Sequence, residues 1–154
     1  MIYSFADFKI EYENLHKRML KHCTGYESSG EPDFTIKVTL DDIEQEKKLS
    51  EGTFSDGYIE TIAFYRKLAE RLPQSNAFVL HSALFDVEGE GIAFAAHSGT
   101  GKTTHMRLWE QLLGDKFKVV NGDKPIIRFF DILLTDTEPL GAVRKIWAAT
   151  QKQS

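Results

Sequence analysis

The sequence predicts an α/β fold in which a phosphate-binding loop lies between a buried strand and a helix. Residues 34–40 alternate between apolar and polar side chains, as a half-buried strand does. Residues 56–72 carry apolar side chains at helical spacing. The chain then reads HSGTGK between a short apolar run at residues 92–96 and a helical pattern at residues 103–113. These three observations give the strand, Gly-rich turn and helix that such a loop requires.

Two strands and a short helix are expected near the N-terminus. Residues 8–12 alternate between apolar and polar side chains, which predicts a strand. Asn14 is expected to cap a short helix over residues 15–20. Residues 24–33 are rich in Gly, Ser and Pro and predict a loop before the strand at residues 34–40.

Paired acids and a second helix follow. Asp41 and Asp42 could bind a metal ion or act as acid and base, but we expect them to cap a solvent-exposed helix. The next helix is expected to open at Ser55–Asp56 and to end before Pro73. Its predicted buried face consists of Ile59, Ile62, Tyr65, Ala69 and Leu72.

A β-hairpin is predicted directly before the Gly-rich stretch. The apolar runs at residues 77–87 and 92–96 are joined by Glu-Gly-Glu-Gly at residues 88–91. His81 lies inside the first run, where we expect a histidine of the core or its rim rather than a ligand.

The stretch SGTGKT at residues 98–103 has the composition of a loop that holds phosphate groups. Its two glycines allow the backbone to point successive N–H groups at one anion. The N-terminus of the following helix adds free N–H groups and partial positive charge. The predicted phosphate-binding residues are Ser98, Gly99, Thr100, Gly101, Lys102, Thr103 and Thr104.

Two side chains of this stretch have expected chemical roles. Lys102 is expected to reach the terminal phosphates as a mobile cation, and the hydroxyl of Thr103 to bind Mg²⁺. The usual pattern begins with glycine, where this chain has Ala96. The alternatives are a coincidental Gly-rich turn and a nucleotide site that has decayed.

Asp123 is the predicted acidic partner of the loop. The apolar run at residues 117–120 ends in NGDKP, and we expect it to be a strand next to the loop strand. Asp123 would then hold Mg²⁺, directly or through water, or accept a proton from the attacking hydroxyl. The alternative is a simple turn, which Asn-Gly-Asp favours. His105 is expected to face either the nucleotide or solvent, and Arg107 is expected at the surface.

Composition and charge exclude several classes of protein. The chain has 154 residues, which suits one domain, and its net charge of −4 with interspersed Lys and Arg argues against a nucleic-acid partner. No apolar run approaches the roughly 20 residues of a membrane span, and the N-terminus lacks the pattern of a signal peptide. One cysteine, Cys23, fits a cytoplasmic protein.

The segments SGTGKTTHMRLW and VVNGDKP resemble the small bacterial proteins of the HPr kinase and ATP-dependent PEP carboxykinase superfamily. SDGYIETIAFYRKLAE and VLHSALFDVEGEGIAFAA are also similar to that group, and the resemblance covers roughly residues 1–128. It implies binding of ATP with Mg²⁺, a phosphotransferase ancestry, and a mixed β-sheet with flanking helices that carries the loop. HPr kinases typically have two adjacent acids where this chain has Gly122–Asp123.

The expected organisation is one P-loop α/β domain over residues 1–154. Residues 1–75 form its N-terminal α+β part, residues 76–128 its nucleotide-binding core, and residues 129–154 its tail. Relatives of this type continue through a Pro-Trp-x-Gly-Lys segment. Codons can be chosen for PLGAVRKIW such that a second reading frame of the same DNA encodes that segment. We therefore expect an out-of-frame tail, an incomplete sheet and self-association; the alternative is a naturally short protein with an amphipathic tail.

Three functions follow from these observations. The first is a Mg-ATP-binding, kinase-like phosphotransferase in which Lys102 and Asp123 are catalytic and the acceptor is a hydroxyl of an unknown protein or small molecule. The second is a nucleotide-binding module without turnover, which the missing acid and short C-terminus favour. The third is a structural or interaction protein with a vestigial loop, which predicts no effect of nucleotide.

Overall fold

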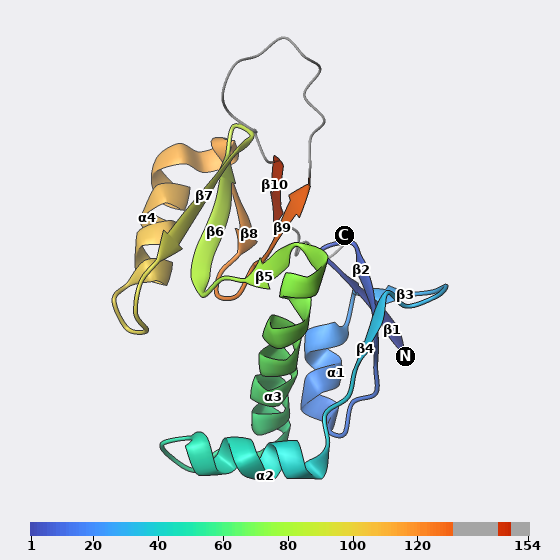
Figure 1. Cartoon of the computed structure of the whole chain (residues 1–154). Coiled ribbons are helices and arrows are strands. Elements are labelled where there is room, and N and C mark those ends of the chain that lie inside the picture. Colours follow the sequence, from blue (N-terminus) through green and yellow to red (C-terminus); the bar gives the residue numbers. More distant parts are fainter. Residues whose placement is uncertain (131–144, 149–154) are drawn as a thin grey trace. The chain divides into compact units, whose positions relative to one another are not determined.

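The computed structural model describes residues 1–130 and 145–148 and confirms an α/β fold (Figure 1). The chain divides into two compact units, of which the first spans Met1–Pro73 and the second begins at Gln74. The first unit has one four-stranded sheet, and the second has two three-stranded sheets. Within the described residues, no helix has both the length and the apolar character that crossing a membrane requires.

The sheet of the first unit is mixed, with the strand order β3-β1-β2-β4. β1 is antiparallel to β2 and β3, whereas β2 and β4 run parallel. The strand predicted at residues 8–12 is confirmed as β2. The strand predicted at residues 34–40 is shorter than expected, because a helix already begins at Leu40. The four strands are β1 (Ile2–Phe5), β2 (Phe8–Tyr12), β3 (Glu27–Ser28) and β4 (Phe34–Ile36).

Three helices and a 3₁₀ turn complete this part of the chain: α1 (Lys17–Cys23), α2 (Leu40–Leu49), α3 (Asp56–Arg71) and η1 (Leu72–Ser75). The prediction that Asn14 caps α1 is wrong. The residue before α1 is His16, and Asn14 Nδ2 donates to its carbonyl at 3.4 Å. The backbone N–H groups of Leu15 and His16, directly before the helix, donate to the carboxylate of Glu60.

The capping role predicted for the paired acids is confirmed for Asp42. Its Oδ2 accepts a hydrogen bond from the backbone N–H of Thr39 at 2.7 Å, and Thr39 Oγ1 accepts one from the N–H of Asp42 at 3.2 Å. This reciprocal pair is a capping box at the start of α2. Asp42 also forms an ion pair of 2.9 Å with Lys67 of α3, so it joins the two helices.

The buried face of α3 differs from the predicted one. Ile59 and Leu72 are buried as expected, but Ala69 is exposed. Ile62 and Tyr65 are only partly buried. The face is rotated because a carboxylate lies at its centre, and a sequence pattern that counts only apolar side chains misses such a residue. The buried residues of α3 are Gly57, Ile59, Glu60, Thr61, Ala63, Phe64 and Leu68.

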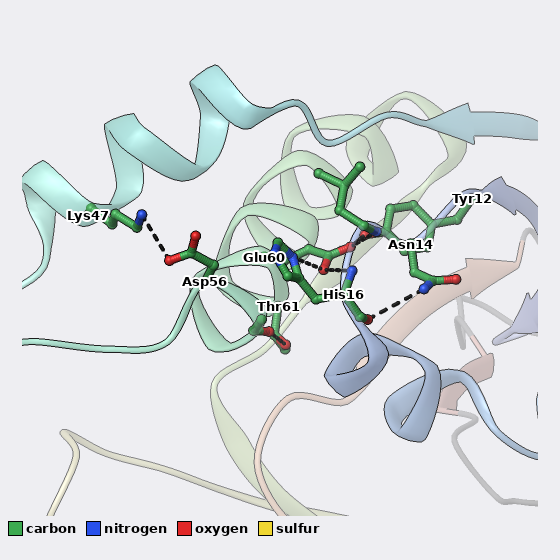
Figure 2. Close-up of polar contacts among 9 residues, drawn as sticks. Tyr12, Asn14, His16, Lys47, Asp56, Glu60 and Thr61 are labelled. Carbon is green, nitrogen blue, oxygen red and sulfur yellow. Dashed lines mark hydrogen bonds and ion pairs between the residues drawn. The ribbon is translucent and has the colours of Figure 1, made fainter.

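Glu60 is fully buried and binds the segment that joins β2 to α1 (Figure 2). Its Oε1 accepts hydrogen bonds from the Tyr12 hydroxyl and from the Leu15 N–H, the latter at 2.7 Å. Its Oε2 accepts a hydrogen bond from the His16 N–H at 2.8 Å and lies 3.0 Å from His16 Nδ1. Burial and the hydrogen bond to Glu60 raise the pKa of Tyr12, so the hydroxyl stays a donor. This carboxylate therefore fixes the path of the chain into α1.

Cys23 is a buried thiol at the end of α1. Burial, together with the negative charges of Glu27 and Glu60, raises the pKa of Cys23 to about 12. Since the thiolate is the reactive form, we expect a thiol reagent at pH 8 to modify the native protein far more slowly than the urea-unfolded protein. Absorbance stopped-flow measures both rates. Similar rates in the two states would contradict the burial of this thiol.

The second unit contains the sheets β10-β9-β5 and β7-β6-β8, in which every described strand pair is antiparallel. The mixed sheet expected around the loop is therefore wrong for the described strands, because both neighbours of β6 run against it. The elements are β5 (Ala77–Val79), β6 (Ser82–Val87), β7 (Glu90–Ala95), α4 (Lys102–Leu113), η2 (Gly114–Lys116), β8 (Phe117–Asn121), β9 (Ile126–Phe130) and β10 (Lys145–Ala148).

The predicted hairpin is confirmed as β6 and β7, with a two-residue turn at Glu88 (φ 52°) and Gly89 (φ 93°). Positive φ at both turn positions matches the twist of the flanking strands. The first apolar run is not one strand, however. It breaks at residues 80–81, so that β5 joins one sheet and β6 the other.

β5 pairs with β9 and β6 pairs with β8, and the register continues across this break as far as Leu84, after which it shifts at Phe85. Val79 lies opposite Ile126 and Leu84 opposite Asn121. Between them the Leu80 N–H donates to the Pro125 carbonyl at 2.9 Å, and the Ser82 N–H donates to the Asp123 carbonyl at 3.0 Å. The four strands thus form a single antiparallel ribbon, which we call the central ribbon.

α4 covers one face of the sheet that carries the loop. Ala83, Phe85 and Phe117 of the sheet are buried against Met106 of the helix. Met106, Trp109 and Leu113 therefore face the sheet, whereas Leu112 is 81% exposed. Half-buried residues that pack against this core are Val87, Ile92, Phe94, Trp109 and Leu113.

The predicted tail, residues 129–154, lies largely outside the described residues. Its two described parts are the end of β9 and the backbone of β10. β10 pairs antiparallel with β9, with Lys145 opposite Phe130 and Ala148 opposite Ile127. This segment therefore forms the edge of the sheet β10-β9-β5.

Candidate functional site

The Gly-rich loop, residues 96–101, joins the end of β7 to the start of α4. Gly99 has a φ of 81°, and Gly101 adopts the left-handed conformation with a φ of 90° and a ψ of 18°. A Cβ added at either position would meet no atom of the described residues within 4 Å. The backbone conformation therefore requires these two glycines, and the space beside them is open.

Free backbone amides lie at the end of this loop. The first hydrogen bond of α4 runs from the His105 N–H to the Gly101 carbonyl, at 2.8 Å. The amides of residues 102–104 precede it and have no acceptor within the helix. Together with the partial positive charge of the helix N-terminus, they form an anion-binding end.

Lys102 adds a full positive charge at the same place. Its ammonium group donates to the carbonyls of Ala96 at 2.6 Å and of His97 at 3.0 Å. The hydroxyl of Thr100 donates to the same His97 carbonyl at 2.7 Å. The lysine side chain thus reaches back across the loop to the end of β7, where it is available to an anion bound by the loop amides.

The remaining predicted phosphate binders are exposed and lie on both sides of Lys102. Ser98 is in the loop, and Thr103 and Thr104 are in the first turn of α4. Their hydroxyl groups are accessible to a ligand, as the binding of phosphate or Mg²⁺ requires. The structure therefore brings together all the residues predicted from SGTGKT.

Asp123 does not follow a strand adjacent to the loop strand, so that expectation is wrong. β6 lies between β7 and β8, because the hairpin returns on one side of β6 and the chain after α4 pairs on its other side. β7 and β8 are both antiparallel to β6 and therefore point the same way. The C-terminal ends of β7 and β8 therefore lie at the same end of the sheet. Asp123 follows β8 and so lies at the end of the sheet that carries the loop.

The turn that holds Asp123 is built by Asn121. Its Oδ1 accepts hydrogen bonds from the N–H groups of Asp123 at 2.9 Å and of Lys124 at 2.8 Å. Asn-Gly-Asp is thus the turn that its composition favours, and this turn fixes the position of the carboxylate. At Gly122, an added Cβ would lie 3.8 Å from Met106 Cε, which is an ordinary contact.

The carboxylate of Asp123 has two polar neighbours. Lys124 Nζ donates to Oδ2 at 2.5 Å, and His81 Nε2 lies 3.3 Å from Oδ1. His81 is 50% exposed, so it is a rim rather than a core histidine. Sequence reasoning did not connect His81 with Asp123. His81 lies directly before β6 in the sequence. Because β6 pairs antiparallel with β8, the start of β6 lies beside the end of β8, and this pairing is what brings His81 to Asp123.

His105 and Arg107 have different surroundings. The His105 ring packs edge-on against Phe94, with ring centres 4.5 Å apart. Its Nε2 accepts a hydrogen bond of 3.2 Å from Trp109 Nε1. The ring is exposed, and Arg107 is exposed as predicted. His105 therefore belongs to an aromatic group beside the loop.

Comparison with known proteins gives no relative from which to assign this site. No family model, no curated protein and no solved structure matches the chain. No group of three or more His, Cys, Asp or Glu side chains arranged to hold a metal ion occurs in residues 1–130 and 145–148. The residues that bear on the chemistry of the site are those of the loop, with Lys102, Thr103 and Asp123.

Proposed function

We propose that this chain is a Mg-ATP-binding, kinase-like phosphotransferase domain that transfers the γ-phosphoryl group to a hydroxyl acceptor. The observation that carries this proposal is the arrangement of β7, the Gly-rich loop and α4, with two left-handed glycines and the Lys102 ammonium at one helix N-terminus. The resemblance to the HPr kinase and PEP carboxykinase superfamily supports it.

Each residue has a defined part in this proposal. The amides of the loop and of the first turn of α4, with Lys102, hold the phosphates and balance their charge. The Thr103 hydroxyl would hold Mg²⁺, and the ion would neutralise charge on the phosphates. Asp123 orients the acceptor hydroxyl and accepts its proton as the new P–O bond forms and ADP leaves. His81 and Lys124 hold the Asp123 carboxylate in place.

Binding without turnover is the second candidate function. Its specific support is that Lys124 Nζ already donates to Asp123 Oδ2 at 2.5 Å, and that this chain has Gly122 where HPr kinases have a second acid. Titration calorimetry with Mg-ATP, followed by assays of ATP consumption with serine-containing proteins and small alcohols as acceptors, separates the two. Binding with turnover supports the first function, and binding alone supports the second. The absence of binding would contradict both.

Asp123→Asn tests the acid directly. We expect at least a 100-fold loss of ATP turnover, the lower part of the range for removing a general base, with a Mg-ATP Kd within about threefold of the wild type. Asp115→Asn is the control, because it removes an exposed acid from the turn after α4. Equal loss of turnover in both variants would show that Asp123 has no special role.

A further inference from the structure

Three aromatic residues form a cluster beside the Gly-rich loop: Phe94 of β7 and His105 and Trp109 of α4. The ring centres of Phe94 and His105 are 4.5 Å apart, and those of Phe94 and Trp109 are 5.8 Å apart. The ring planes meet at 65° and 72°, respectively. We call this group the aromatic cluster.

The His105 ring is held in one orientation. Trp109 Nε1 is a donor only, so the His105 Nε2 that it contacts at 3.2 Å is the accepting nitrogen. The proton of the neutral imidazole is therefore on Nδ1, which is a donor. Phe94 and Trp109 fix the ring from two sides, so little rotamer entropy is lost when a flat ligand stacks on it.

The aromatic cluster adjoins both ends of the loop. Phe94 lies two residues before Ala96, where the loop begins, and His105 closes the first turn of α4 on Gly101. His105 is three residues after Lys102, so the rise per residue of an α-helix places it about 4.5 Å further along the helix axis. A ligand anchored by phosphates at the loop therefore has an aromatic surface within one helical turn.

The exposure of His105 separates it from ordinary core packing. Trp109 and Phe94 are half-buried and pack against Phe85 of β6, at 5.6 Å and 4.9 Å between ring centres. His105 is exposed and lies outside that core. The core would be complete without it, whereas a stacking surface requires an aromatic ring that solvent can reach.

We propose that the aromatic cluster is the nucleobase subsite of the nucleotide whose phosphates occupy the Gly-rich loop. This inference rests on the proposed function and adds to it the recognition of the base. The base stacks on the exposed His105 ring, and Nδ1–H donates to a ring nitrogen or carbonyl oxygen at its edge. Because every nucleobase has a π-face, stacking alone gives affinity for the base with little discrimination between bases.

The test compares Mg-ATP with Mg-tripolyphosphate, which has the phosphates without the base. We expect the full chain to bind Mg-ATP about tenfold more tightly, within the range for one base stacked on an aromatic side chain. His105→Ala should reduce this ratio to about one and leave the Kd for Mg-tripolyphosphate unchanged. His105→Phe, which retains a ring, should restore most of the ratio. Leu112→Ala is the control on the same helix, because Leu112 is 81% exposed.

Trp109 provides a second readout. The chain has two tryptophans, so Trp147→Phe leaves Trp109 as the single emitter. Mg-ATP should change its fluorescence, and Mg-tripolyphosphate should not. Equal wild-type affinities, or a preference for ATP that survives His105→Ala, would overturn the subsite while the phosphate site stands. No binding of either ligand would overturn the proposed function, and the subsite with it.

Discussion

Lys102→Ala is expected to abolish most of the affinity for Mg-ATP without unfolding the protein. The Lys102 ammonium is the full positive charge that reaches across the Gly-rich loop, and its partners in the structure are two loop carbonyls. Loss of its charge-assisted hydrogen bonds to phosphate should cost about 3 kcal/mol, or roughly a 150-fold rise in Kd. Titration calorimetry measures the Kd, and the nucleotide-induced rise in Tm should shrink in parallel.

Lys118→Ala is the matched control for this experiment. It removes the same charge from β8, where Lys118 is exposed, and so changes the net charge of the protein equally. We expect its Kd to stay within about twofold of the wild type, because a charge outside the loop acts only through screened solvent. If both lysine variants bind Mg-ATP as well as the wild type does, phosphate binding by the Gly-rich loop is wrong.

Glu60→Ala is expected to destabilise the first unit by about 3–5 kcal/mol, as removal of one partner from a buried charged network does. The substitution leaves the Tyr12 hydroxyl and the N–H groups of Leu15 and His16 without their acceptor, and it opens a cavity at the centre of the buried face of α3. Urea unfolding followed by far-UV circular dichroism should show the loss as a lower midpoint.

Two further variants distinguish the hydrogen bonds from the loss of volume. Glu60→Gln keeps one accepting oxygen and nearly the same volume, so we expect about half the destabilisation of Glu60→Ala. Glu70→Ala removes an exposed carboxylate from the same helix and should change stability by less than about 0.5 kcal/mol. A midpoint for Glu60→Ala that matches that of Glu70→Ala would show that the buried network contributes little.

Local patterns predicted the elements well where one physical rule acted alone. Alternation predicted β2, the acids at residues 41–42 predicted the capped start of α2, and Glu-Gly-Glu-Gly at residues 88–91 predicted the hairpin. Errors arose where tertiary contacts compete with those rules. Glu60 is buried on α3 and binds the backbone directly before α1, whereas a sequence pattern treats that residue as a surface charge.

The residues of the candidate site were easier to predict than their arrangement. The glycines, Lys102 and Thr103 occupy adjacent positions in the sequence, so the local strand, loop and helix suffice to bring them together. Asp123 and His81 depend on which strands pair. The order β7-β6-β8 puts a strand between the loop and the acid, and the same pairing brings His81 to Asp123. Periodicity carries no information about strand order.

The central ribbon has a consequence for how the site forms during folding. The hairpin turn, β7, the Gly-rich loop and α4 all lie in the chain between β6 and β8, two paired strands of the ribbon. Pairing of β6 with β8 therefore requires closure of the long segment between them. This non-local step is slower than formation of the hairpin or the helix. In refolding, ATP turnover, which depends on Asp123, should therefore appear later than the helical signal of α4.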